Sequence, residues 1–212
     1  MGVWSRSFTL KDDFMKKMFA LGLVLLSSVA LAQAPAPTQR LRGVVKSFDG
    51  ATLVVAERSG ETISLALADN FSVSEVFAIE PAAIKPGSYI GTAAVQGADG
   101  NLSALEVLVF PEAARGAGEG HSPWDLQPGS TMTNATVAEL ASTPKGRSMM
   151  LRYRDGEKTV VIPENVPIVT FKPGDKSLLV AGAKVLVTAQ LRDGKPTALR
   201  VLAGRDGFAP PM

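Results

Sequence analysis

The 212-residue chain contains no cysteine, and this absence excludes several kinds of chemistry. No disulfide can support the fold, so its stability must come from a hydrophobic core. A lipid anchor attached to a lipobox cysteine and a cysteine nucleophile are excluded for the same reason. Histidine is nearly absent too: His121 is the only one, whereas zinc sites usually combine several His or Cys ligands.

Motifs for nucleotide binding and acyl transfer are also lacking. Residues 116–120 read GxGxG rather than GxGxxG, because His121 stands where the last glycine belongs, and no GxxxxGK[ST] occurs. No GxSxG elbow accompanies His121. A carboxylate pair of the glycosidase kind leaves no sequence pattern, but no acidic residue stands out from ordinary surface charge. We therefore predict that the protein is not an enzyme.

Long apolar runs are absent except for one near the start of the chain. Lys16 and Lys17 precede about a dozen apolar residues, which end in the small-x-small site 30–32 (Ala-Leu-Ala). This pattern predicts a secretory signal peptide over residues 1–32, cleaved after Ala32, and a periplasmic protein. The run is shorter than the roughly 20 residues that span a bilayer, so we predict no membrane span in the mature chain.

The mature chain also lacks a charge excess. The first 32 residues hold four of the 22 basic residues and two of the 20 acidic ones, which leaves 18 of each. Proteins that bind nucleic acid through its phosphates normally carry a clear basic excess. We therefore predict no nucleic-acid partner, and expect instead a periplasmic protein or a small ligand.

What the chain does have is an internal repeat. Residues 99–108 (DGNLSALEVL) match 193–202 (DGKPTALRVL) as DGxxxALxVL, and 58–61 (RSGE) match 154–157 (RDGE) at nearly the same offset. This self-similarity predicts two tandem domains of similar structure. The organisation that we predict is a signal peptide (1–32), an N-terminal linker (33–42), a first repeat (43–110), an interdomain loop (111–133), a second repeat (134–204) and a C-terminal tail (205–212).

Each repeat is a series of short segments rich in β-branched residues and separated by turn pairs such as Asp49-Gly50 and Asp193-Gly194. Residues 72–85, between the third and fourth segments, suggest one or two helical turns. Three strands, a short helix and two strands is the order of an OB-like barrel. We predict an all-β protein of two small OB-like five-stranded barrels in tandem, joined by a Gly/Pro-rich loop. A β-sandwich has the same strand count and stays open as an alternative.

The stretches GxVxS (43–47), DGATLVV (49–55), IKPGSYIGTAAV (84–95) and DGNLSALEVL (99–108) resemble a family of exported bacterial OB-like domains of unknown function. The resemblance covers the first repeat well. The second repeat departs from it at 141–146, where the first turn is longer. For two-repeat proteins with a GEGH-type linker, the resemblance also implies a link to metal transport.

The most distinctive residues lie in the interdomain loop, where GEGHSPWDL (118–126) contains His121, Trp124 and Asp125. A disordered linker seldom contains tryptophan, so we expect Trp124 to dock on one barrel or between the two. Three interpretations stay open. Trp124 fills a groove while Asp125 caps a turn; or the aromatic ring, with His121 and Asp125, recognises a ligand or partner; or His121, Glu119, Asp125 and Met132 bind copper or another transition metal.

Overall fold

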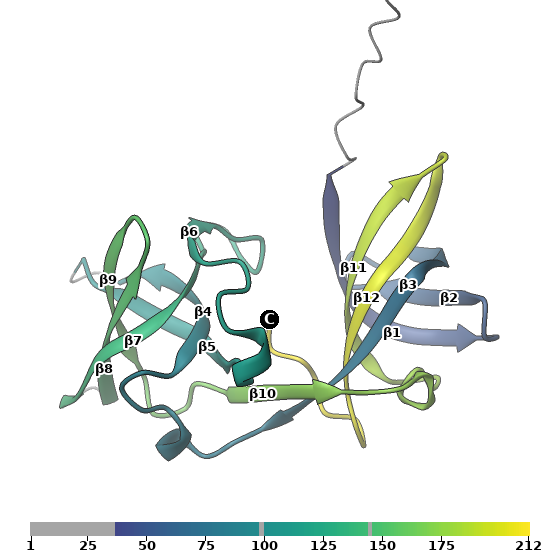
Figure 1. Cartoon of the computed structure of the whole chain (residues 1–212). Helices are drawn as coiled ribbons and strands as arrows, with labels where there is room; N and C mark the ends of the chain where they lie inside the picture. The colour runs from purple at the N-terminus through teal and green to yellow at the C-terminus, as the bar shows by residue number, and fades with distance from the viewer. Residues whose placement is uncertain (1–36, 98–99, 144–145) are drawn as a thin grey trace, which may run out of the picture. The chain divides into compact units, whose positions relative to one another are not determined.

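The computed structural model describes residues 37–97, 100–143 and 146–212, and this part of the chain is almost entirely β-strand (Figure 1). The prediction of an all-β protein is confirmed: twelve strands form one continuous sheet. The only helical elements in the described ranges are three short 3₁₀ turns, η1 (Pro81–Ala83), η2 (Glu112–Ala114) and η3 (Lys176–Leu178). None of them is long enough, or apolar enough, to cross a membrane. The predicted signal peptide lies outside the described residues.

Five strands close into a barrel. They are β1 (Thr38–Phe48), β2 (Thr52–Glu57), β3 (Thr62–Ala78), β11 (Lys184–Arg192) and β12 (Lys195–Gly204). β1 pairs with β2, β2 with β3, β3 with β12, β12 with β11, and β11 with β1 again. All of these pairings are antiparallel except β3–β12. Their inward side chains, including Leu53, Leu65 and Val187, are fully buried and form one hydrophobic core.

Five further strands extend the sheet. They are β4 (Tyr89–Gln96), β5 (Leu102–Val109), β7 (Thr131–Thr143), β8 (Gly146–Tyr153) and β9 (Gly156–Ile162). They pair in the order β5-β4-β7-β8-β9, and a short parallel pairing at Leu102 and Ser103 joins β5 to β9. These strands surround a second core that includes Ile90, Met149 and Val160. β6 (Gly120–Pro123) pairs with β7.

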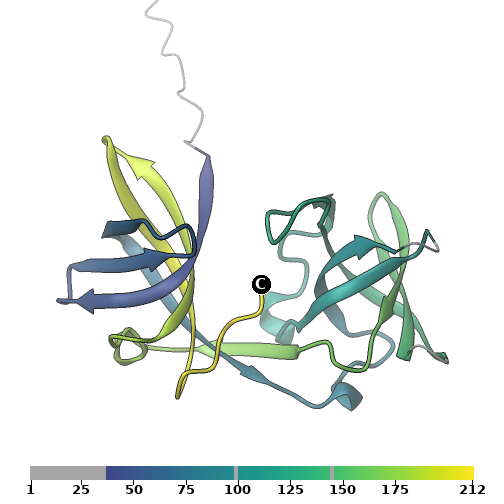
Figure 2. The same cartoon turned by 180° about the vertical axis from the view of Figure 1, so that it is seen from behind.

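β10 (Ile168–Pro173) connects the two sets of strands. It pairs antiparallel with the second half of β3 and parallel with β5, and it runs between the two sets in both views (Figures 1 and 2). A third, smaller core lies here, with Val76, Leu108, Val169, Leu186 and Met212 as its buried members. Met212 shows that the predicted C-terminal tail packs its end into the protein, where its side chain is 3% exposed.

The strands do not group as the sequence repeats do. The barrel takes β1, β2 and β3 from the first repeat but β11 and β12 from the second, and the other set takes β4 and β5 from the first and β7, β8 and β9 from the second. The five-stranded barrel is therefore closed by β11 and β12, which lie in the predicted second repeat.

Tight turns connect the strands where the sequence places Asp-Gly pairs. Between β11 and β12, Asp193 and Gly194 have φ angles of 48° and 73°, which suit the two-residue hairpin turn that this pair favours. Before β2, the Asp49 carboxylate accepts hydrogen bonds from the backbone amides of Ala51 and Thr52, at 2.9 and 2.7 Å. The predicted turns at 49–50 and 193–194 are confirmed; Asp99, in the corresponding turn of the first repeat, lies outside the described residues.

The structure differs in part from three expectations about local structure. Residues 72–78 are strand, not helix, because this half of β3 is hydrogen-bonded on both sides, to β12 and β10; only Pro81–Ala83 forms a helical turn. Residues 38–42, predicted to be linker, begin β1 because they pair with β11. The loop 111–133 is not wholly irregular, since β6 pairs with the start of β7 within it.

Candidate ligand-binding site

A cavity of about 280 Å³ lies beside Trp124, where β1, β5, β10, β11 and β12 approach the loop that follows β6. Its walls are largely apolar, formed by Leu108, Phe110, Phe171, Leu186, Leu202 and Met212 among others. Phe110 and Phe171 meet edge to face, with ring centroids 5.9 Å apart, an arrangement that fixes both rings. Cavities that hold drug-sized ligands begin at about 300 Å³, so this one suits a small molecule.

Equivalent positions of the two repeats contribute to this cavity. Leu108 and Leu202 occupy the same position of the DGxxxALxVL motif, and both line it. Glu106 and Arg200 occupy the variable position two residues earlier, and both line it as well. The cavity therefore has an acidic residue from β5 and a basic residue from β12 at the same position of the motif.

Glu106 is a fully buried carboxyl group with one hydrogen bond. Its Oε1 atom accepts a 3.0 Å hydrogen bond from the backbone amide of Ala93, whereas its Oε2 atom is buried and has no partner among the described residues. Burial raises the pKa of Glu106 to about 8, although the Ala93 amide and the positive charge of Arg42 act in the opposite direction. The group is therefore largely protonated at neutral pH and can donate a hydrogen bond.

Trp124, which lines the same cavity, has a second unpartnered polar atom. Its ring is half-buried, and the guanidinium carbon of Arg40 lies 3.9 Å from the ring centroid, which is a close cation–π contact. Its Nε1 atom is buried and donates to no described residue. Buried indole N–H groups usually have a hydrogen-bond acceptor, so this donor is a second polar group of a lining residue whose partner is missing.

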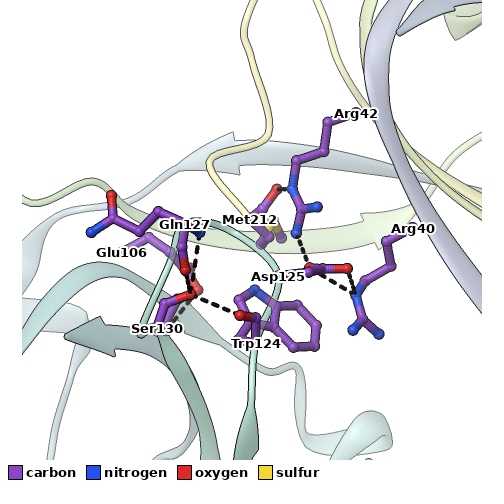
Figure 3. Close-up of polar contacts among 9 residues, drawn as sticks. Arg40, Arg42, Glu106, Trp124, Asp125, Gln127, Ser130 and Met212 are labelled. Carbon is purple, nitrogen blue, oxygen red and sulfur yellow. Dashed lines mark hydrogen bonds and ion pairs between the residues drawn. The ribbon is translucent and has the colours of Figure 1, made fainter. Parts of the chain in front are cut away.

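Ser130 fixes the loop that carries Trp124. The hydroxyl group of this buried serine lies 3.0 Å from the main-chain oxygen of Trp124 and 2.7 Å from that of Gln127, and it accepts from the Gln127 amide. The Trp124 amide in turn donates a 2.8 Å hydrogen bond to the Ser130 carbonyl. The loop is therefore closed on itself at both ends (Figure 3).

Two ion pairs join this loop to β1. The Asp125 carboxylate lies between the guanidinium groups of Arg42, at 2.8 Å, and Arg40, at 3.0 Å (Figure 3). Burial alone would raise the pKa of Asp125, but hydrogen bonds from Arg42 and Arg40 hold it below its usual value. Arg42 is itself buried, and its Nε donates a 2.8 Å hydrogen bond to the main-chain oxygen of Met212. Asp125 thus pairs with arginines and does not cap a turn.

His121 lies elsewhere. It is on β6 opposite Thr133, and its Nδ1 atom is 2.8 Å from the Thr133 hydroxyl. It lines a separate depression together with Lys158. Burial lowers the pKa of His121, and the positive charge of Lys158 lowers it further. The structure therefore brings Trp124 and Asp125 together at one site but places His121 at another.

The four residues proposed as metal ligands do not form one ligand set. Met132 lines the cavity. On β7 it is next to Thr133, the residue opposite His121, and neighbouring residues of a strand point to opposite faces, so Met132 faces away from His121. Glu119 accepts a 3.0 Å hydrogen bond from the Arg154 amide, and Asp125 is paired with arginines. Within the described ranges, no three His, Cys, Asp or Glu side chains gather as metal ligands would.

The sequence analysis missed Glu106, Arg40 and Arg42. A signal for Glu106 was present, because the repeat motif ALxVL is apolar except at the position where Glu106 and Arg200 stand. A charged residue between buried neighbours on a predicted strand is a reason to expect a special environment. No comparable signal distinguishes Arg40 and Arg42, since their role depends on a partner 85 and 83 residues away.

Comparison of the sequence with protein-family models and with curated proteins finds no match.

Proposed function

We propose that this protein is an exported, non-catalytic binding module that holds a small ligand in the cavity beside Trp124. The observation that carries the proposal is the cavity itself. Its walls combine apolar side chains with a few polar ones, Phe110 and Phe171 are fixed against each other, and two of its lining residues, Glu106 and Trp124, each have a buried polar atom without a described partner. Apolar walls with a few placed polar groups are typical of small-molecule sites.

The proposal includes the architecture that the repeat predicts, two OB-like barrels in tandem, each completed by strands of the other repeat. Irregular register supports this idea. A shift between Val45 and Ser47 on β1 corresponds to one between Val137 and Glu139 on β7, and a shift at Ala93 on β4 corresponds to one at Thr188 on β11. β-Bulges at related positions are expected if the two units share one ancestral design.

A periplasmic location and the resemblance to exported OB-like domains are part of the same proposal. An exported chain without cysteine relies on packing for its stability, and the loop closed by Ser130 and Asp125 gives the ligand site a fixed wall without a disulfide. A preformed site of this kind loses little conformational entropy when a ligand binds.

The experiment is a titration with 1-anilinonaphthalene-8-sulfonate, a probe that fluoresces in apolar sites. We expect saturable, one-to-one enhancement with the native protein, and its loss in Leu202→Trp, whose larger side chain fills the cavity. Leu191→Trp is the control, because Leu191 is 58% exposed and does not line the cavity. Equal enhancement in both variants, each shown by circular dichroism to be folded, would refute the proposed site.

A further inference from the structure

We infer that the ligand is a small monocarboxylic acid with an apolar body, whose carboxylate is bound by Glu106, Trp124 and Arg200. This inference rests on the proposed function, because it names the ligand class of the same cavity. It follows from the polar groups that the cavity leaves without partners and from the charges around it.

The unpartnered groups call for an acceptor. Trp124 Nε1 is a donor only, and so is the guanidinium group of Arg200, an exposed residue of β12 that lines the cavity and has no ion pair with any described residue. Glu106 Oε2 is the third group, and a carboxyl group in its protonated form donates through that oxygen. A ligand that offers acceptor oxygens satisfies all three, whereas a ligand that offers only donors satisfies at most an ionised Glu106.

The charges around Glu106 favour an anion over a cation. Arg40 and Arg42 reach this region from β1 and Arg200 from β12, while Asp125 on the loop is the negative group paired with the first two. With Glu106 protonated, positive charge is in excess. An ammonium ligand would be repelled by Arg40 and Arg200, which line the cavity, and a neutral ligand would gain no charge attraction from them.

The rest of the cavity fits an apolar body. Leu108, Leu202, Phe110 and Phe171 line it, together with the Met212 side chain. Acceptor oxygens at one end of a short hydrocarbon satisfy the polar groups, and its methylene groups contact this wall. Each buried methylene contributes about 0.8 kcal/mol, which converts to roughly a fourfold change in affinity.

The test is isothermal titration calorimetry at pH 7 with three probes that share one chain: octanoate, octan-1-ol and octylammonium. We expect octanoate to bind about tenfold more tightly than octan-1-ol, and octylammonium to bind most weakly. Equal or tighter binding of octan-1-ol, or tighter binding of octylammonium, would overturn the inference.

Three variants test the named groups. Arg200→Gln removes the guanidinium charge and Trp124→Phe removes the indole N–H while keeping an aromatic ring; each should weaken octanoate about tenfold but leave octan-1-ol within about twofold. Arg192→Gln, on the same hairpin but outside the cavity, is the matched control and should bind octanoate as the wild type does. Equal loss for both probes would show a packing effect and would overturn the role of these donors.

Glu106→Gln tests the remaining donor through pH. In the wild type, octanoate should bind about tenfold more weakly at pH 9 than at pH 7, because the fraction of protonated Glu106 falls. In Glu106→Gln this decrease should disappear while binding at pH 7 persists; a wild-type affinity independent of pH would overturn the assignment of Glu106.

If anilinonaphthalenesulfonate binds the cavity but octanoate has no advantage over octan-1-ol, this inference alone fails. If none of the probes binds, the proposed function fails with it.

Discussion

The Arg42 guanidinium group donates a 2.8 Å hydrogen bond to the Asp125 carboxylate and so connects β1 with a loop 83 residues further along the chain. Arg42 is buried, and its other contacts include the main-chain oxygen of Met212. One side chain thus holds together the first strand, the Trp124 loop and the last residue of the sequence. The loop that carries Trp124 is thus held by this long-range contact as well as by the local hydrogen bonds of Ser130.

Replacing Asp125 with asparagine should destabilise the protein by about 1–2 kcal/mol. The substitution leaves the buried Arg42 without its counter-charge, although the 44% exposure of the Asp125 side chain lets water compensate in part. It should also loosen Trp124, whose emission should shift to longer wavelength. Both are measured by urea unfolding and fluorescence in a Trp4→Phe background, where Trp124 is the only tryptophan.

The control for this substitution is Glu112→Gln, which breaks the exposed ion pair between Glu112 and Arg115. Exposed pairs of this kind contribute about 0.2–1 kcal/mol, and this one does not contact the Trp124 loop. If Asp125→Asn and Glu112→Gln gave the same small loss and neither moved the Trp124 emission, the ion pairs would not hold the loop in place.

Ser130→Ala should cost about 1–2 kcal/mol, because the buried hydroxyl group bonds to both Gln127 and Trp124. Ser122→Ala, an exposed position on the adjacent β6, should change stability by less than about 0.5 kcal/mol. Chemical denaturation of the two variants measures the difference. Equal stability would mean that the loop holds its shape without Ser130.

The pairing of β1 with β11 predicts a specific cross-link. Val44 on β1 pairs with Lys184 on β11, and the chain has no cysteine, so Val44→Cys with Lys184→Cys should form an intramolecular disulfide under mild oxidation. Thr136→Cys with Lys184→Cys is the matched control, since Thr136 holds in the second repeat the position that Val44 holds in the first. Cross-linking of the control pair alone, detected by gel mobility and mass spectrometry, would mean that each repeat closes on itself.

The sequence predicts strands and turns well but not how the strands close. Alternation of β-branched residues and Asp-Gly pairs act locally, so the hairpin at Asp193-Gly194 could be predicted from a few residues. Closure of the barrel depends on whether β4 and β5 or β11 and β12 pair with β1 and β3. The two pairs have similar sequences, so the sequence alone does not favour either one. The extension of β3 through residues 72–78 was missed for a related reason, because its partners β10 and β12 are distant in sequence.

The site was predictable only in part. Trp124 in a glycine- and proline-rich loop suggested docking, and its half-buried ring against Arg40 agrees with that expectation. His121 was predicted to be a site residue because it is the only histidine of the chain, yet rarity alone does not place a residue in a site. Glu106 stands at the one charged position of the apolar ALxVL motif, which points to a special environment, but the motif does not show that Glu106 is buried while Arg200, at the same position, is exposed.

The buried Glu106 predicts a pH dependence of stability that a single substitution removes. Its pKa is about 8 in the folded protein and near 4.5 when exposed, so the folded state binds the extra proton between these values and stability must fall as pH rises through that window. The slope is about 1.4 kcal/mol per pH unit, and it levels off above the folded pKa.

Other groups also titrate, so the informative quantity is the unfolding free energy of wild type minus that of Glu106→Gln, which stays neutral at all pH values. Measured by urea unfolding from pH 5 to pH 9, this difference should drop by about 2–3 kcal/mol between pH 5 and pH 7. The exposed Glu164→Gln is the control and should differ from wild type by a constant amount, because that side chain is solvated in both states. A difference for Glu106→Gln that is equally flat would mean that Glu106 reaches water or an ionic partner in the folded protein, and the cavity would then hold a carboxylate, not a hydrogen-bond donor.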